Sequence, residues 1–233
     1  MDVLTMKRVF AKTTPAFTRI ELLLCICIVL LLTLTLGRSI VTSRSRADRV
    51  QCFNNMRQIG NAYIQFGLEH YDQMPWRLDS AQGGNHDINP QRHSLWYQYW
   101  FVRDALKTPT ILMDPAETRA NARVATAWDL SETGLQRVKD GAVAYMLGLD
   151  ALPTNPRSIL LTDRNVIDSG STGFPLSEVR LLATQAQWFD DIHGLVGNVA
   201  FADGSIEALN TEQFRAALAQ SGRQQVHAMK GAW

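Results

Sequence analysis

The chain has 233 residues, of which 46% are hydrophobic and 19% are charged, and its formal net charge is +1. This length fits one main domain with attachments and is enough to bury a core. A near-zero net charge argues against a nucleic-acid-binding surface, which usually carries a concentrated basic excess. With only three cysteines, the chain is not a small protein held together by a disulfide framework.

The apolar residues are concentrated near the start of the chain. From Ile20 to Leu36, all but three residues are apolar. As a helix, the uncharged run Leu22–Gly37 rises about 24 Å at 1.5 Å per residue, which approaches the hydrocarbon thickness of about 30 Å in a bilayer. The pattern therefore predicts a membrane-spanning helix.

A cleaved secretory signal peptide is the alternative interpretation of this run, because basic residues precede it. Glu21 argues against that alternative. A carboxylate inside a membrane segment costs about 2–3 kcal/mol on insertion scales, and a removable signal has no use for it. The segment is therefore expected to be retained.

The residues at the start of the apolar run resemble the type IV prepilin signal, and they read Ala16-Phe17-Thr18-Arg19-Ile20-Glu21. The resemblance implies that a prepilin peptidase cleaves between Ala16 and Phe17 and methylates the new amine of Phe17. It also implies that Glu21 meets the terminal amine of a neighbouring subunit during assembly. Two residues depart from the family pattern: Ala16 replaces a glycine, and Arg19 replaces an apolar residue and offers Glu21 a second partner.

The next stretch is predicted to continue the helix to about Glu69, because proline is absent from positions 16–74 and apolar residues recur every three or four positions. Its motif resembles that of pseudopilin-like proteins of the type II secretion type and reads Cys52-Phe53-Asn54-Asn55-Met56-Arg57-Gln58-Ile59-Gly60. On one continuous helix the three cysteines cannot bond one another. Metal binding by them is not expected, because histidine is missing at ligand spacing.

The later part of the chain is predicted to be a globular head. Its aromatic segment 93–101 is expected to form a short helix whose rings pack on the stem, with glycan stacking as the alternative. No cofactor is expected. The alternative is a calcium site built from some of Asp163, Asp168, Asp190, Asp191 and Asp203, with Asp190, Asp191 and Asp203 as the narrower set. A resemblance to type II major pseudopilins suggests such a site, although an EF-hand spacing is lacking.

The most informative late segment predicts a β-hairpin, with runs at 198–202 and 205–209 and a two-residue turn at Asp203-Gly204. The spacing from His193 to Asp203-Gly204 resembles the C-terminal signature of a pilin-like family from planctomycete and verrucomicrobial bacteria. His193 is interpreted as a hydrogen-bonded structural residue, because a nucleophile in a recognised arrangement is lacking. A helix capped by Thr211 is expected to run to about Gln220, followed by an exposed tail.

Together these patterns predict an α+β, pilin-like fold, in which a long N-terminal helix with a transmembrane first half packs on a C-terminal antiparallel β-sheet. The expected segments are a cytoplasmic leader, a transmembrane helix, an extracytoplasmic stem, a globular head and a tail, at 1–16, 17–37, 38–72, 73–220 and 221–233. We expect a bacterial inner-membrane protein with a single span, a cytoplasmic N-terminus and a periplasmic head.

The expected function is structural, without enzyme activity: a pseudopilin that assembles through its apolar helix into a periplasmic pseudopilus for type II-like protein secretion. The expected partners are prepilin peptidase, other pseudopilin subunits, the inner-membrane secretion platform and membrane lipid, but not nucleic acid. A non-polymerising, membrane-anchored protein that binds glycans is the alternative.

Overall fold

The computed structural model describes residues 18–87, 94–167, 178–221 and 225–229, without the side chains of 33–44, 178 and 225. The chain forms two compact units, Met1–Arg44 and Ser45–Trp233. Helix α1 (Arg19–Glu69) has 51 residues and contributes to both. The expected cleavage site at Ala16 and Phe17 lies outside the described residues.

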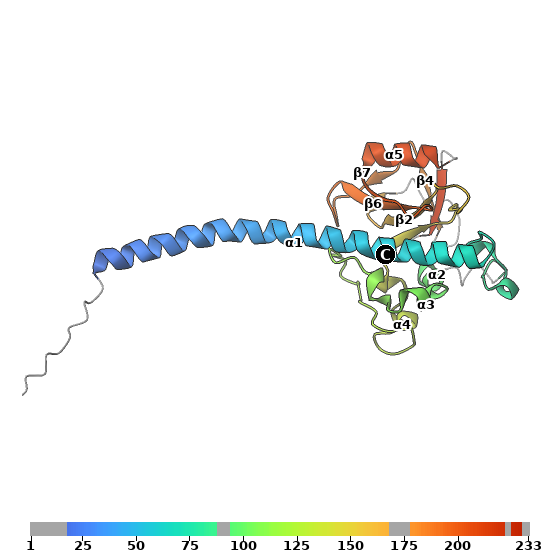
Figure 1. The fold of residues 1–233 in the computed structure, drawn as a ribbon, viewed down its shortest axis with the longest axis horizontal. Coiled ribbons are helices and arrows are strands. Elements are labelled where there is room, and N and C mark those ends of the chain that lie inside the picture. The colour runs from blue at the N-terminus through green and yellow to red at the C-terminus, as the bar shows by residue number, and fades with distance from the viewer. Residues whose placement is uncertain (1–17, 88–93, 168–177, 222–224, 230–233) are drawn as a thin grey trace, which may run out of the picture. The chain divides into compact units, whose positions relative to one another are not determined.

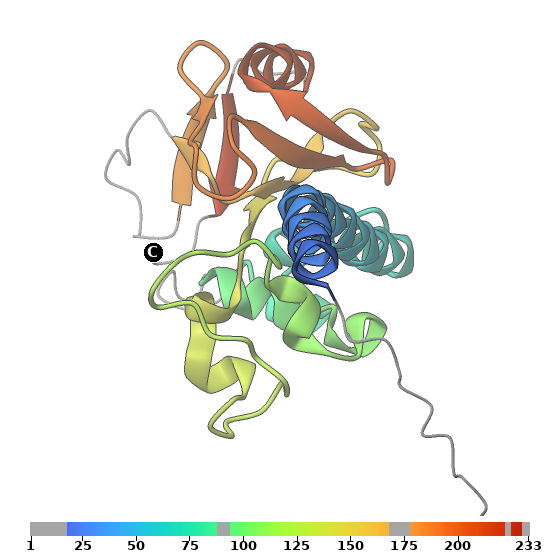
Figure 2. The ribbon, with the colours of Figure 1, turned by 90° about the vertical axis from the view of Figure 1, so that its left-hand side faces the viewer.

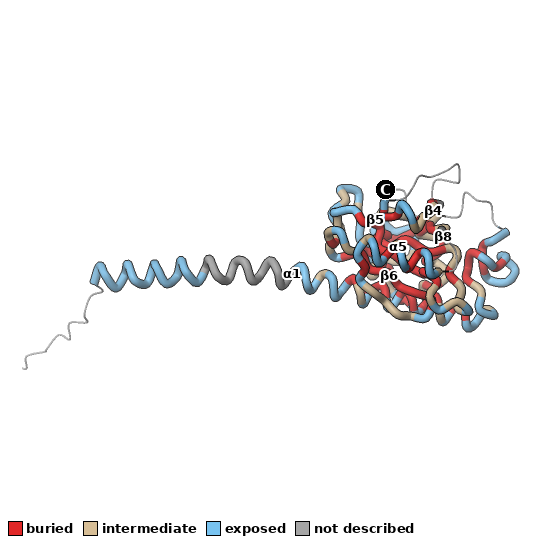
Figure 3. The backbone as a smooth tube through the Cα atoms, turned by 90° about the horizontal axis from the view of Figure 1, so that it is seen from above, coloured by how far each residue is buried: buried red, intermediate tan, exposed pale blue. Residues whose placement is uncertain are grey.

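The described part of the first unit is the beginning of α1, and its apolar side chains are exposed (Figure 3). Thr18 precedes the helix and caps it together with Glu21: the Thr18 backbone N–H and hydroxyl each donate a hydrogen bond of 2.8 Å to Glu21 Oε2. Glu21 N in turn donates to Thr18 Oγ1 at 3.3 Å. This reciprocal arrangement satisfies amide groups that a helix N-terminus otherwise leaves without partners.

The expected transmembrane half of this helix, and with it the predicted fold class and the single-pass inner-membrane location, is contradicted. Crossing a hydrocarbon core takes about 20 consecutive, predominantly apolar residues in helical form. Among the residues that the structure describes, none of the helices combines the length and the apolar character that crossing a membrane requires. What the structure does have is an α+β architecture with an antiparallel sheet.

The second unit is built around a six-stranded sheet of order β4-β8-β1-β2-β6-β7, in which all the pairings are antiparallel. Helix α5 covers one face, and residues 45–69 of α1 and the shorter helices lie on the other (Figures 1 and 2). The strands are β1 (Tyr145–Gly148), β2 (Ile159–Asp163), β4 (Glu178–Leu182), β6 (Val196–Phe201), β7 (Ile206–Asn210) and β8 (Gln225–Met229), with β3 (Val166–Ile167) pairing β5 (Gln187–Trp188) separately. The helices and 3-10 turns are η1 (Pro75–Arg77), η2 (Ser80–Gln82), α2 (Leu95–Trp100), α3 (Arg103–Leu106), η4 (Pro109–Leu112), α4 (Leu135–Val138), η5 (Lys139–Ala142) and α5 (Thr211–Gln220).

The sheet separates two hydrophobic cores. The core on the α1 side receives Ala200 from β6, whereas Val199 and Phe201 enter the core on the α5 side, as the period of two along a strand requires. Helix α1 contributes a stripe of buried residues at spacings of three and four: Cys52, Met56, Ile59, Tyr63 and Phe66. The predicted continuation of the helix to Glu69 is confirmed. The apolar face expected from the sequence, with Val50, Phe53, Met56, Gly60, Tyr63, Gly67 and Tyr71, is only partly right, because Val50 and Tyr71 are 61% and 93% exposed.

The aromatic segment forms the short helix α2, as expected, and its rings pack on α1. Tyr99 is fully buried, and the centroid of its ring lies 6.0 Å from that of Tyr63 in an edge-on arrangement. The Tyr99 hydroxyl donates to the Tyr145 carbonyl oxygen at 3.1 Å. Phe101, just after α2, meets Phe66 in the same way at 6.5 Å. Two rings of the predicted aromatic segment, Tyr99 and Phe101, therefore pack on α1.

The predicted hairpin is confirmed, but its turn is longer than expected. The register pairs Val199 with Glu207 and Ala200 with Ile206, so three residues, 202–204, connect the strands beyond the Phe201 and Ser205 pair. Gly204 has a positive φ of 81°, whereas a two-residue type I′ turn needs positive φ at both central residues. A three-residue loop with glycine in the left-handed region fits this geometry better.

The C-terminal part contains the expected helix and an unexpected strand. Helix α5 ends at Gln220 as predicted but begins one residue earlier than expected. Its cap is Asn210 instead of Thr211, and Asn210 Oδ1 accepts a 2.9 Å hydrogen bond from Gln213 N. The prediction of an exposed tail is wrong for residues 225–229, because β8 lies between β4 and β1 in the sheet. Val226 and Met229 are buried there.

Candidate metal centre

Four side chains that carry metal-binding atoms meet inside the second unit. They are Cys52, Asp114, Asp163 and His193, and one ligand atom of each lies within 4.8 Å of the others. All four residues are buried. This group can hold a metal ion, because a thiol, an imidazole and two carboxylates converge in one place.

Each of the four comes from a different part of the fold. Cys52 lies on the buried stripe of α1, and Asp163 is the last residue of β2. Asp114 follows η4, and His193 lies in the loop before β6. The buried side of one helix and the ends of three other segments therefore build the group.

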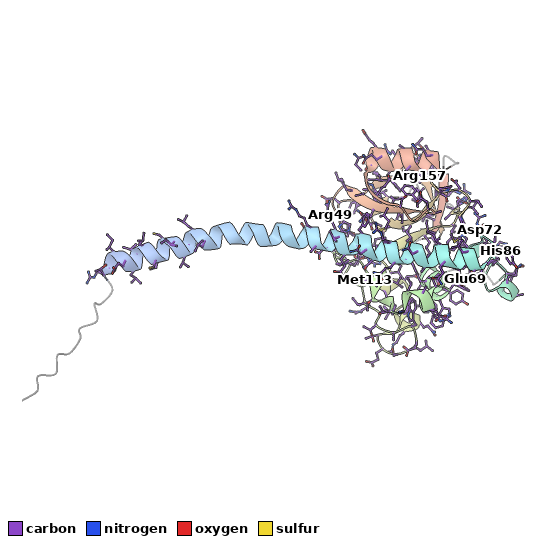
Figure 4. All side chains as sticks on the ribbon, viewed as in Figure 1. Arg49, Glu69, Asp72, His86, Met113 and Arg157 are labelled. Atoms are coloured by element: carbon purple, nitrogen blue, oxygen red, sulfur yellow. The ribbon has the colours of Figure 1, made fainter. Side chains whose placement is uncertain are left out.

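Helix α1 also binds the two loops directly. Arg49 Nη2 donates to the His193 carbonyl oxygen at 2.8 Å. Asn55 Nδ2 donates to the Met113 carbonyl oxygen at 3.3 Å, next to Asp114. Figure 4 labels Arg49 on α1 and Met113 beside the helix. These contacts fix the positions from which His193 and Asp114 enter the group.

Both carboxylates are oriented by hydrogen bonds from the backbone. Asn198 donates to Asp163 Oδ2 through its backbone N–H at 2.7 Å and through Nδ2 at 3.0 Å, while Asp163 Oδ1 lies 3.5 Å from Cys52 Sγ. Ala116 N donates to Asp114 Oδ1 at 2.7 Å, while Asp114 Oδ2 lies 3.0 Å from His193 Nε2. Each carboxylate thus has one oxygen held by the protein and the other facing the group.

A second layer of buried charges connects the same segments. Glu117 accepts from Arg164 Nε at 2.7 Å and pairs with Arg119 Nε at 2.9 Å, and Arg164 Nη1 pairs with Asp191 Oδ2 at 2.7 Å. Arg164 follows Asp163, Glu117 lies three residues after Asp114, and Asp191 lies two residues before His193. The network therefore holds together the three segments that supply these ligands.

The electrostatics of the group favour a cation. Burial, and then the charge of Asp114, raises the pKa of Asp163 to about 7. Burial lowers the pKa of His193, but the hydrogen bond and charge of Asp114 outweigh it, so the net shift is upward. Two buried carboxylates thus share one imidazole, and a buried charge needs a partner.

A cysteine and a histidine in one site also raise the question of nucleophilic catalysis. Burial, followed by the charges of Asp163 and Asp114, raises the pKa of the Cys52 thiol. Reactive cysteines have lowered pKa values and partial exposure, whereas Cys52 is 0% exposed. The arrangement suits ligation by this thiol better than attack on a substrate.

The structure separates the residues of the predicted C-terminal signature. His193 precedes β6, and Asp203 and Gly204 form the turn after it, so they lie at opposite ends of the strand. Asp203 Oδ1 accepts from Ser205 N at 2.8 Å, which is a turn-forming role. The alternative calcium set is also divided, because Asp191 pairs with Arg164 and belongs to the charged network, and Asp203 belongs to the turn.

Sequence reasoning missed the group because its four members are far apart in the chain. The expectation that histidine does not accompany the cysteines is wrong for Cys52, which His193 approaches through the fold. One usable signal is the apolar run Ile159-Leu160-Leu161, which is followed by Thr162 and then by Asp163-Arg164-Asn165. Polar residues that end a buried strand and begin a loop are candidates for a site, because loops carry many binding residues. Glu21, the other predicted site residue, is exposed at the start of α1.

Comparison with known proteins does not assign the chain to a family. No protein-family model matches the chain, and no match is found among the curated proteins or the solved structures. Function therefore rests on the residues and geometry of the chain itself.

Proposed function

We propose that this chain is a pilin-like structural subunit, processed at its N-terminus by a prepilin peptidase and polymerised with other subunits through the beginning of α1. The observation that carries the proposal is the exposure of apolar side chains on this helix. Seven of them between Ile20 and Val29 are 48% to 76% exposed: Ile20, Leu22, Leu23, Leu24, Ile26, Ile28 and Val29.

These side chains surround the helix. Successive residues are about 100° apart around the helix axis. Viewed down this axis, the largest angle between neighbouring apolar side chains is about 100°. A helix that is apolar on all sides is stable only when its surroundings are apolar as well. One partner helix covers a single stripe, so several neighbours are needed to cover this surface. Burying one leucine or isoleucine contributes about 1.5–3 kcal/mol, which makes association of such helices strongly favourable.

The charges at the start of the helix favour neighbours of the same kind. Arg19 and Glu21 carry opposite charges and are both exposed. In a bundle of identical helices in register, the Glu21 carboxylate of one copy lies at the same height as the Arg19 guanidinium and the new Phe17 amine of another. It can pair with either cation. Such a pair fixes register, because a carboxylate buried without a cation is costly.

Cysteine cross-linking tests this assembly. Cys25 and Cys27 are free and exposed, and they lie about 200° apart around the helix. If several copies pack around the beginning of each α1, a permeant thiol oxidant applied to cells that co-express the chain and a prepilin peptidase should produce a ladder of dimers, trimers and larger species on a non-reducing gel. Cys27→Ser leaves Cys25 as the one exposed thiol on this part of the helix and should stop the ladder at dimers.

The control for this experiment is Cys52, which is buried. The double variant Cys25→Ser/Cys27→Ser keeps Cys52 and should remain monomeric on the gel. Glu21→Gln retains a side-chain oxygen for the Thr18 cap but removes the charge, and we expect at least a tenfold smaller yield of cross-linked species. A wild-type chain that stays monomeric under oxidant, or a ladder unchanged by Glu21→Gln, argues against the proposed assembly.

A further inference from the structure

The buried group in the second unit has the dimensions of a four-coordinate metal site. A tetrahedral zinc ion with bonds of about 2.0–2.3 Å has ligand atoms about 3.3–3.8 Å apart. Two distances between ligand atoms are already close to these values. Cys52 Sγ lies 3.5 Å from Asp163 Oδ1, and His193 Nε2 lies 3.0 Å from Asp114 Oδ2. All four ligand atoms lie within 4.8 Å of one another, so small side-chain movements complete a tetrahedron.

We infer that Cys52, Asp114, Asp163 and His193 bind one divalent transition-metal ion, with zinc as the best fit. The donor set selects this class. Calcium and magnesium take six or more oxygen ligands, whereas a thiolate and an imidazole beside two carboxylates suit zinc. This inference is independent of the proposed assembly, because it uses only residues of the second unit.

The residues around the four ligands support the assignment. Metal-ligating carboxylates are usually oriented by hydrogen bonds to their other oxygen, and both Asp114 and Asp163 have this arrangement. Asn198 Nδ2 also lies 3.3 Å from Cys52 Sγ, and an N–H donor directed at sulfur stabilises a thiolate. The protein thus orients three of the four ligand atoms from outside.

The burial of the four ligands indicates a structural role. A cavity of about 220 Å³ lies next to the group on the side of His193 and Asn198, and Arg49, Phe53 and Val196 also line it. Four protein ligands that are all buried describe a closed site, which is typical of structural rather than catalytic zinc. Bound metal would join α1 to β2 and to the loops that carry Asp114 and His193.

Cobalt binding tests the site, because Co²⁺ replaces zinc and reports its own coordination. The full chain is stripped with a chelator, dialysed and titrated with Co²⁺. We expect one ion per chain, visible absorption of a tetrahedral ion and a near-ultraviolet charge-transfer band from a cobalt–thiolate bond. Zn²⁺ should abolish both signals and, at a hundredfold excess over its Kd, raise the melting temperature by about 5–10 °C.

Two variants and a matched control make the result decisive. Cys52→Ser should lose the charge-transfer band and at least tenfold in Zn²⁺ affinity, whereas Cys25→Ser/Cys27→Ser should keep both. Asp163→Asn should keep the band and bind Zn²⁺ about 10–100-fold more weakly, which gives a readout if Cys52→Ser does not fold. A chain that takes up no stoichiometric Co²⁺, or variants whose band and affinity equal those of the wild type, would overturn the assignment.

Discussion

Glu117→Gln should lower the free energy of unfolding by about 3 kcal/mol, because it removes the carboxylate that pairs with two buried arginines, Arg119 and Arg164. The Glu117 side chain is 3% exposed, and those of Arg164 and Arg119 are 7% and 9% exposed. Breaking a buried pair by removing one partner typically costs about 3–5 kcal/mol, since the other charge stays buried without compensation. Asp191 still pairs with Arg164, which places the expected loss at the lower end.

The same substitution at Glu207 is the matched control. Glu207 Oε1 lies 2.7 Å from Arg157 Nη1, but the two side chains are 42% and 40% exposed. Exposed pairs contribute about 0–1 kcal/mol, so Glu207→Gln should change stability by less than about 1 kcal/mol. Urea denaturation of both variants measures the difference. Equal losses would mean that the Glu117 network does not hold the three segments together.

Gly197→Ala should also be strongly destabilising, by about 3 kcal/mol, because a Cβ atom there has no room. Built on the backbone, it would lie 2.3–2.5 Å from three ring atoms of Trp188. That indole is buried and packs on Phe214 with ring centroids 4.4 Å apart, so it cannot move aside without disturbing the core on the α5 side. Overpacking of a filled core typically costs about 1–3 kcal/mol and occasionally more.

Gly60→Ala, which makes the same chemical change at another position, should instead increase the stability of the protein. Gly60 lies within α1, and a Cβ atom there meets nothing within 4 Å. Alanine is favoured over glycine inside a helix by about 1 kcal/mol, so this variant should be more stable than the wild type. Thermal unfolding of the two variants checks both signs. A stable Gly197→Ala chain would show that the Trp188 ring does not pack directly against Gly197.

Local sequence patterns predicted the parts of the fold that local contacts determine. The spacing of Met56, Gly60 and Tyr63 predicted the middle of the buried side of α1, although the same pattern also included Val50 and Tyr71, which are exposed. The runs on either side of Asp203-Gly204 predicted the hairpin. Strand β8 was missed because five residues after a helix carry little local signal, and its place between β4 and β1 depends on pairing with distant strands. The transmembrane prediction relied on composition, whereas the described helices do not meet the requirement for crossing a membrane.

The metal-binding group could not be predicted from local sequence patterns either. Sequence rules for metal sites rely on ligands close together in the chain, but Cys52, Asp114, Asp163 and His193 are brought together only by packing of α1 against the sheet and loops. His193 was singled out by its motif, and Cys52 by the stem motif. Their meeting in one buried group needed the three-dimensional structure.

The proposal that this chain is a processed, pilin-like subunit is tested most directly by the mass of the N-terminal peptide of the mature chain. The chain is produced together with a prepilin peptidase, and its N-terminal peptide is identified by mass spectrometry. If the chain is processed as proposed, it begins at Phe17 and carries one methyl group on its amine. An intact Met1, or a chain that begins near Arg38 as after signal-peptide cleavage, would contradict it.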